Sequence, residues 1–414
     1  MTSVAVVGGG YAGMAAAVTL AARGARVVVH EAGPVLGGRA RRVRVRGETF
    51  DNGQHILVGA YTALLGLMRE CSVRSEALLR LPLELRYADG FALRPFWLPA
   101  PLGLLGGLLA APLPLRERLG AVRFMLALRR ARYRCEPDCS VAELLARHAQ
   151  DGRIGRYLWQ PLCVSALNTP PAQASANAFL AVVRDALAGG DGASDLLLPA
   201  TDLSQLFPEP AADFVRARGG EVRVSSPVRD LEALRREHAH VVVAVGPHHL
   251  ERLIPGLLPA CAYQPIVTCY LQYAPAARLP LPMLGFSGGL VHWAFDRGRL
   301  LGERGRIACV VSAEGEHQRM SAGEIAEACA RELAAAAPAL GAPVSSQVIS
   351  EKRATVACTP GFARIGPRTP LDHVWLAGDY TDPVYPPTLE AAVRSGLRAA
   401  DCVLAGGAAL SPGA

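Results

Sequence analysis

The stretch FDNGQHILVGAY, residues 50–61, contains four polar residues between apolar ones. They are Asp51, Asn52, Gln54 and His55. A carboxyl or imidazole group can transfer a proton to a reacting atom when neighbouring groups orient it. The same residues can instead be structural, with Asp51 and Asn52 capping turns and His55 satisfied in the core. The segment is therefore a candidate for acid–base chemistry, and the elements around it decide between these roles.

A glycine-rich turn comes shortly before this segment. The chain begins with a short valine-containing run at residues 3–7, then a glycine cluster, an alanine-rich helical stretch to Arg23, and a second apolar run at 27–29 that ends at Glu31. Strand, glycine turn, helix, strand and acid in this order are typical of a dinucleotide-binding βαβ unit. A glycine-rich turn with a purely structural role is the alternative.

Each residue of this unit has a mechanical reason to be there. Gly8 allows the tight turn, Gly10 lets a pyrophosphate approach the backbone N–H groups of a helix N-terminus, and Gly13 permits close packing of helix on strand. Glu31 is placed to accept hydrogen bonds from a ribose hydroxyl. We find no second such fingerprint and expect no dedicated NAD(P)H domain.

Composition sets limits on the class of protein. The 414 residues suffice for two or three domains, and the net charge of +7 comes from dispersed basic residues that form no nucleic-acid module, so we predict no nucleic-acid partner. The 51% hydrophobic content and mean hydropathy of +0.22 indicate an apolar pocket, a membrane-facing surface, or simply enrichment in Ala and Leu.

Cysteine usage indicates the compartment. Of ten cysteines only Cys135 and Cys139 lie close together, and no second pair or nearby His completes a zinc site, so we predict no metal. We expect reduced thiols in a cytoplasmic protein. The apolar N-terminus lacks a basic n-region, which argues against a signal peptide.

Two further motifs carry a family resemblance. Gly37, Gly38 and Arg39 follow Glu31 closely, and a predicted strand at 373–377 precedes the stretch LAGDYT and a helix-forming stretch PTLEAAVRSG. These motifs resemble those of the amine oxidase and carotenoid desaturase superfamily of flavoproteins. The resemblance implies FAD, with Gly38 and Arg39 beside its phosphates.

The same resemblance assigns roles near the C-terminus. Asp379 would bind the ribityl or pyrophosphate region of FAD. The helix beginning at Thr388, with Leu389 and Glu390 in its first turn, would direct its positive end toward the flavin and stabilise the reduced, anionic form. The alternative is that Thr388 and Glu390 only cap a surface helix.

The resulting fold prediction is α/β: a Rossmann-type FAD-binding domain with a second, mixed α+β substrate domain. We place the FAD domain at residues 1–90, 205–250 and 355–414, and the substrate domain at 91–204 and 251–354. Expected strands and one expected amphipathic helix between the two ends are assigned from apolar patterning. The strands are 219–224, 227–231, 241–245, 261–273 and 306–311, and the helix is 322–337.

Residues 98–134 suggest a membrane-facing element. Residues 98–115 are uncharged, but four prolines and three glycines argue against a spanning helix, and we expect an apolar loop. Seven arginines alternate with apolar residues over 116–134, as in a basic amphipathic helix resting on an anionic membrane. A core-packed loop with a solvated arginine face is the alternative.

Three internal stretches narrow the resemblance to one family. FDNGQHILVGAY, LWQPLCVSALNTPPAQASANAF (158–179) and SDLLLPATDLSQLFPEPAADFVRARGG (194–220), together with the FAD motifs, resemble the hydroxysqualene dehydroxylase family of bacterial hopanoid pathways. The resemblance covers nearly the whole chain. It implies that a C30 allylic alcohol loses its hydroxyl and gains a hydride to give squalene.

This chemistry gives the polar cluster a possible role. His55, or else Asp51, could protonate the leaving hydroxyl, with Asn52 and Gln54 orienting them. Aromatic faces would stabilise an allylic cation, and the candidates are Tyr61, Trp159, Trp293 and Tyr385. The resemblance further suggests an external electron donor such as NADPH or a redox protein, a hydroxysqualene synthase partner, and peripheral contact with the inner face of the cytoplasmic membrane.

Two alternatives stay open at this stage. A carotenoid- or squalene-type desaturase or an oxidase would keep the fold but reverse the electron flow. A non-catalytic isoprenoid-binding protein would keep the fold but tends to lose the flavin fingerprint, which is intact here.

Overall fold

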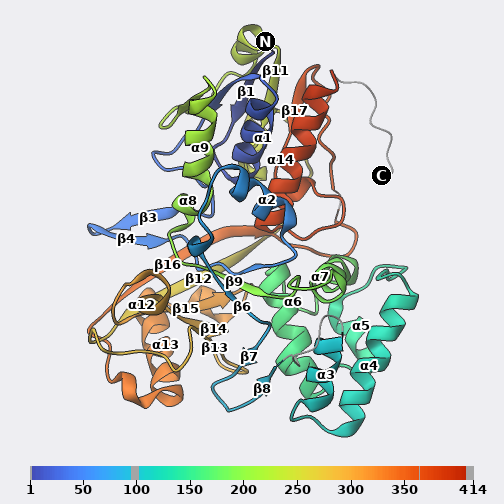
Figure 1. Ribbon diagram of the computed structural model, residues 1–414, viewed down its shortest axis with the longest axis vertical. Helices are drawn as coiled ribbons and strands as arrows, with labels where there is room; N and C mark the ends of the chain where they lie inside the picture. Colours follow the sequence, from blue (N-terminus) through green and yellow to red (C-terminus); the bar gives the residue numbers. More distant parts are fainter. Residues whose placement is uncertain (1, 95–101, 363, 407–414) are drawn as a thin grey trace.

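A five-stranded parallel sheet forms the upper part of the molecule (Figure 1), in the order β10–β2–β1–β11–β17. The computed structural model describes residues 2–94, 102–362 and 364–406. The five strands are β1 (Ser3–Val7), β2 (Arg26–His30), β10 (Glu221–Arg223), β11 (His240–Val243) and β17 (Val374–Leu376). They come from three distant parts of the chain, and the predicted Rossmann-type α/β arrangement is confirmed.

Both faces of this sheet are buried, as parallel sheets require. Val4 and Val6 pack into the cluster that contains α1, whereas Ala5 and Val7 pack with Leu250 on the opposite face. One face carries α1 (Tyr11–Ala22), α9 (Pro208–Ala217) and α14 (Leu389–Leu404), and the other α10 (Leu231–Glu237) and α11 (Pro247–Leu253). The period-2 alternation of the strand thus selects which helices cover each face.

A second, antiparallel sheet lies below the first (Figure 1), in the order β13–β14–β15–β12–β16. Cys269 and Ile307 from this sheet are fully buried with Leu333 of α13. The predicted strands at 261–273 and 306–311 and the helix at 322–337 agree with the structure. The elements are β12 (Tyr263–Gln272), β13 (Met283–Gly285), β14 (Trp293–Asp296), β15 (Arg306–Ser312), β16 (Ser345–Val356), α12 (Arg297–Leu301) and α13 (Ala322–Ala336).

Short ribbons and a group of helices complete the fold. The ribbons are β3 (Arg42–Val45) with β4 (Glu48–Asp51), β5 (Leu57–Val58) with β9 (Leu196–Pro199) and β6 (Leu78–Leu81), and β7 (Leu85–Arg86) with β8 (Ala92–Leu93). The helices are α2 (Thr62–Glu70), α3 (Leu102–Ala110), α4 (Leu115–Arg130), α5 (Val141–Arg147), a π-helical turn (Gly155–Trp159), α6 (Gln160–Leu167), α7 (Ala176–Ala188) and α8 (Leu203–Leu206). Helices α3 to α7 gather at one lower corner (Figure 1).

Two sequence predictions are wrong. Residues 227–231 form no strand but lead into α10, because the Asp230 side chain accepts from the Ala233 N–H and caps that helix. The stretch 98–115 is not all loop, since α3 forms within it and its prolines flank the helix rather than interrupt it. Residues 98–101 lie outside the described residues.

Within the described part of the chain, no helix is both long enough and apolar enough to cross a membrane.

Candidate active site

A cavity of about 1930 Å³ opens at the carboxyl ends of the parallel strands. Gly8, Glu31, Ala244 and Gly378 each follow one of these strands and line it, and residues 350–355 of β16 form the facing wall. Ligands of open α/β sheets bind at this edge. Because ordinary ligand pockets measure about 300–1,000 Å³, this cavity has room for a dinucleotide and a second molecule.

The two glycine motifs face each other at one end of the cavity. The Gly37 N–H donates to the Gly9 carbonyl at 2.9 Å, and a Cβ on Gly38 would lie 3.2 Å from the Gly10 Cα. Gly13 does not line the cavity, but a Cβ there would lie 1.9 Å from the Gly8 oxygen. The absence of a side chain at Gly13 therefore permits the close approach of α1 to the turn.

Three charged candidate residues lie beside the two glycine motifs, which we call the glycine cradle. Glu31 lines the cavity, and its carboxylate accepts from the N–H groups of Gly9 and Gly33, both at 2.7 Å. Arg39 donates to Asp379 Oδ1 at 2.6 Å and to the Ala354 carbonyl at 2.8 Å, joining the two motifs across 340 residues. Burial opposes the charge of Arg39, but Asp379 outweighs it and raises the Arg39 pKa.

The cavity lining is strongly basic. Eight basic side chains face three acidic ones, Glu31, Glu351 and Asp379. Together with the N-terminus of α1 and its unobstructed Gly10, this lining suits the diphosphate of a dinucleotide. The residues present therefore fit the predicted FAD. The basic residues are Arg39, Arg41, Arg42, Arg44, Arg229, Arg252, Lys352 and Arg353.

The three candidate residues at the start of α14 have different roles. Thr388 and Leu389 line the cavity, and the Thr388 hydroxyl also accepts from the Ala391 N–H and caps the helix. Glu390 is fully buried and does not line the cavity. Its carboxylate accepts from the N–H groups of Ala63 and Leu64 at 3.0 and 2.9 Å, so it caps α2 and positions that helix.

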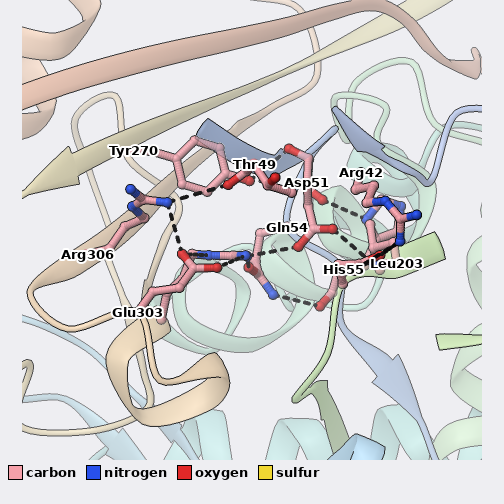
Figure 2. A network of polar contacts seen from close by, with 12 residues as sticks. Arg42, Thr49, Asp51, Gln54, His55, Leu203, Tyr270, Glu303 and Arg306 are labelled. Carbon is pink, nitrogen blue, oxygen red and sulfur yellow. Dashed lines mark hydrogen bonds and ion pairs between the residues drawn. The ribbon is translucent and has the colours of Figure 1, made fainter. Parts of the chain in front are cut away.

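The polar cluster Asp51, Asn52, Gln54 and His55 lies at the end of β4 and in the segment that leads to β5. Asp51 is 2% exposed and does not line the cavity. Its Oδ2 accepts from Arg297 Nη1 at 2.9 Å, and the same nitrogen donates to Gln54 Oε1 at 2.9 Å. Glu303 accepts from the other side of the guanidinium at 2.8 and 2.7 Å (Figure 2). Asp51 and Gln54 are thus anchored to a buried arginine that the sequence analysis did not identify.

Asn52 and His55 do line the cavity, as does Gln54. Asn52 Nδ2 donates to the Arg39 carbonyl and to Glu351 Oε2, both at 2.9 Å, and so connects the cluster to the cofactor side. His55 Nδ1 lies 3.0 Å from the Gly53 carbonyl. An Nδ1–H that donates there leaves Nε2 as the free ring nitrogen.

Burial shifts the pKa values of the two candidate acids in opposite directions. It raises the pKa of Asp51, and Arg297 and the Leu203 N–H oppose the shift. Burial lowers the pKa of His55, with the Gly53 carbonyl opposing and Arg39 adding to the shift. His55 is therefore mostly neutral at pH 7, whereas Asp51 is engaged in an ion pair away from the cavity.

Only one of the four aromatic candidates lines the cavity. Tyr61 lines it, whereas Trp159, Trp293 and Tyr385 do not. Phe295, which sequence reasoning missed, lines it from β14. Its position could have been found only from the pairing of β14 in the second sheet, since no motif surrounds it.

The chain is similar over nearly its full length to characterised families. The model of the flavin containing amine oxidoreductases matches residues 11–404. Hydroxysqualene dehydroxylase of Rhodopseudomonas palustris is 31% identical over 98% of this chain and 99% of its own length, and that of Sinorhizobium fredii is 28% identical over 97% and 98%.

Solved structures agree on the fold. A putative protoporphyrinogen oxidase from Exiguobacterium superimposes with a TM-score of 0.69 at 17% identity, covering 97% of this chain and 98% of that one. The match to the flavin containing amine oxidoreductase model supports FAD as the cofactor. The chain belongs to the flavin containing amine oxidoreductase family and, within it, to the hydroxysqualene dehydroxylase family.

Proposed function

We propose that this protein catalyses the FAD-dependent reductive dehydroxylation of hydroxysqualene to squalene. The observation that carries the proposal is one cavity that is lined by the glycine motifs, by His55 and by a set of apolar and aromatic side chains. Two relatives that span the whole chain bear the name hydroxysqualene dehydroxylase, which supports this substrate. The apolar wall is formed by Ile56, Tyr61, Ala166, Ile266, Phe295 and Leu389.

Replacing an allylic hydroxyl by hydrogen needs a proton, a hydride and a site that tolerates positive charge. FAD, in its reduced state, supplies the hydride. The protein must protonate the hydroxyl, because hydroxide is a poor leaving group, and must exclude water from the cationic carbon. Tyr61 and Phe295 line the cavity and would offer aromatic faces to that carbon. Burial raises the pKa of Tyr61, so that it stays a neutral phenol.

We assign the proton to Nε2 of His55. With Nδ1 held by the Gly53 carbonyl, only Nε2 is available to the cavity, and Asn52 and Gln54 fix the backbone on either side of Gly53. Asp51 is a positioning residue in this scheme, since Arg297 and Leu203 occupy its carboxylate. The reacting form is the imidazolium, which burial makes a minor species at neutral pH.

The pH dependence follows from this assignment. The His55 pKa lies below 6.5, so kcat/KM should be level at low pH and fall about tenfold per pH unit above that pKa. His55→Ala should lower kcat by about 10²–10⁴-fold and abolish this limb. The measurement is steady-state squalene formation from pH 5 to 8 with saturating reductant.

A matched control is His373→Asn. His373 is exposed, does not line the cavity, and has φ of 61°, which Asn tolerates. It should keep the wild-type profile. A His55→Ala enzyme with the wild-type pH limb would show that another group donates the proton.

The proposal extends to partners. Each turnover consumes two electrons, which NADPH or a redox protein would deliver to the flavin. The substrate is a C30 hydrocarbon alcohol that partitions into lipid, so we further propose supply from a hydroxysqualene synthase and peripheral contact with the inner face of the cytoplasmic membrane through residues within 98–134.

The function is tested under anaerobic conditions. The flavin of the purified protein is reduced with dithionite, the excess is removed, and hydroxysqualene is added while flavin absorbance and lipid products are followed. One squalene formed per flavin reoxidised is the expected result. Intact hydroxysqualene beside a flavin that stays reduced would overturn the proposal.

Two further outcomes identify the alternatives. Oxidised protein that becomes reduced by squalene or a carotenoid precursor, with hydrogens lost from the lipid, would identify a desaturase. A colourless protein that binds the lipid without flavin would identify an isoprenoid carrier.

A further inference from the structure

Helix α4 carries a second apolar face that its packing does not use. Ala121, Phe124 and Leu128 point inward and are 0–3% exposed. Leu115, Leu119 and Leu126 are 66%, 43% and 52% exposed. At 100° per residue these three leucines fall within about 40° of one another on the opposite side of the helix, and we call them the outer leucine stripe.

The neighbouring helix α3 exposes a further leucine. Leu109, near the end of α3, is 44% exposed. The Arg118 guanidinium donates to the carbonyls of Leu109 and Leu113 at 2.8 and 2.7 Å, which fixes the end of α3 against the start of α4. The two helices are thereby joined close to these exposed leucines.

The charge around the stripe is almost all positive. Residues 116–134 contain seven arginines and one acid, Glu117, whose carboxylate is used to accept from the Ile154 N–H at 2.8 Å. Six of the arginines are exposed, and over the described residues none of the six forms an ion pair: Arg116, Arg123, Arg129, Arg130, Arg132 and Arg134.

We propose that the outer leucine stripe and its flanking arginines bind the surface of an anionic lipid bilayer, with α4 lying in the interface. Leucines enter the boundary between headgroups and acyl chains while arginines contact anionic headgroups, which is how basic amphipathic helices bind membranes. A second copy of this chain fits poorly, because a two-fold contact would bring two sets of like charges together.

The inference names the surface for the membrane contact proposed above, and rests on the proposed function only for its purpose, the supply of a lipid substrate. The experiment uses the flavin-loaded protein and co-flotation with vesicles of phosphatidylcholine alone or with about 30% phosphatidylglycerol. We expect binding to the anionic vesicles only, decreasing at least tenfold between 0.05 and 0.5 M NaCl.

Variants separate the apolar and electrostatic contributions. Leu115→Ser/Leu119→Ser/Leu126→Ser should lower the partition coefficient at least tenfold, and Arg123→Gln/Arg129→Gln/Arg130→Gln about tenfold or more at low salt. Val344→Ser is the matched control, since Val344 is 74% exposed and lies outside α4, and it should bind as the wild type does.

The outcomes are decisive in both directions. Equal vesicle binding by the wild type and the triple leucine variant, or no binding by the wild type, would overturn the proposal. A wild-type dimer that the leucine variant converts to monomer would overturn it in favour of a second copy. Turnover of detergent-dispersed hydroxysqualene is measured separately, so failure of the catalytic proposal does not affect the binding result.

Discussion

Replacing Arg297 by methionine should destabilise the folded protein by about 3–5 kcal/mol, because it leaves the buried Asp51 carboxylate without its charged partner and leaves Glu303 with Arg306 alone. Arg297 is 1% exposed, and its guanidinium serves Asp51, Gln54 and Glu303 at once. Burial opposes its charge, but Glu303, Tyr270 and Asp51 outweigh that effect and raise the Arg297 pKa. Urea unfolding followed by circular dichroism measures the change in free energy.

The control lies seven residues further along the chain. Arg304 is exposed, and its side chain has no partner among the described residues, so Arg304→Met should change stability by no more than about 0.5 kcal/mol. Arg297→Lys should recover only part of the loss, because an ammonium cannot form the forked pair with Glu303. Equal unfolding midpoints for Arg297→Met and the wild type would contradict this account.

A double-mutant cycle tests whether the network acts as a unit. The double variant Arg297→Met/Asp51→Asn should lose less unfolding free energy than the two single variants lose in sum. Each substitution removes a buried charge, so the other charge no longer needs a partner. The same variants release the Gly53 turn that holds His55, so kcat should fall more than KM changes. Additive losses would place Asp51 and Arg297 in separate environments.

The parts of the fold that sequence reasoning predicted correctly are locally determined. The turn at Gly8 and Gly10 depends on residues within a few positions, where steric and hydrogen-bonding rules apply directly, and the cap at Thr388, which the sequence left as the alternative role, is of the same local kind. The strand wrongly predicted at 227–231 is a local failure as well, because a helix cap at Asp230 was not recognised. The family motifs extended the prediction to Asp379 and the helix beginning at Thr388.

What the sequence could not predict depends on long-range pairing. Arg297 lies 246 residues from Asp51, and it reaches that carboxylate only because β14 is a strand of the second sheet. Glu390 was assigned to the cofactor from its motif, yet its carboxylate serves α2, more than 300 residues earlier. No periodicity or spacing specifies such partners. They follow from tertiary packing alone.

The α3 region illustrates a third kind of failure, in which the composition was interpreted correctly but the geometry was not. Prolines and glycines in residues 98–115 argued for a loop, although prolines outside a helix leave its interior hydrogen bonds intact. The apolar and basic character was evident in the sequence. The exposure of the outer leucine stripe could not be predicted, because the same sequence pattern would also suit a helix that is buried on two sides.

The second large effect is expected at Gly13. Gly13→Ala should weaken FAD binding at least about 100-fold, or about 3 kcal/mol, because its Cβ would lie 1.9 Å from the Gly8 oxygen and force α1 away from the turn. Backbone on both sides of this contact leaves no flexible side chain to move. The measurement is flavin titration of the deflavinated protein, followed by flavin fluorescence.

Gly66→Ala makes the same chemical change in a different environment. Gly66 lies inside α2, where a Cβ would meet nothing within 4 Å, so alanine should stabilise the helix by up to about 1 kcal/mol and leave FAD affinity unchanged. Wild-type affinity in Gly13→Ala would mean that the close approach of α1 to Gly8 is not required. Weakened affinity in both variants would point to a general loss of folding rather than to the cradle. Loss of FAD affinity in Gly13→Ala alone would therefore attribute the effect to the close contact between α1 and the Gly8 turn.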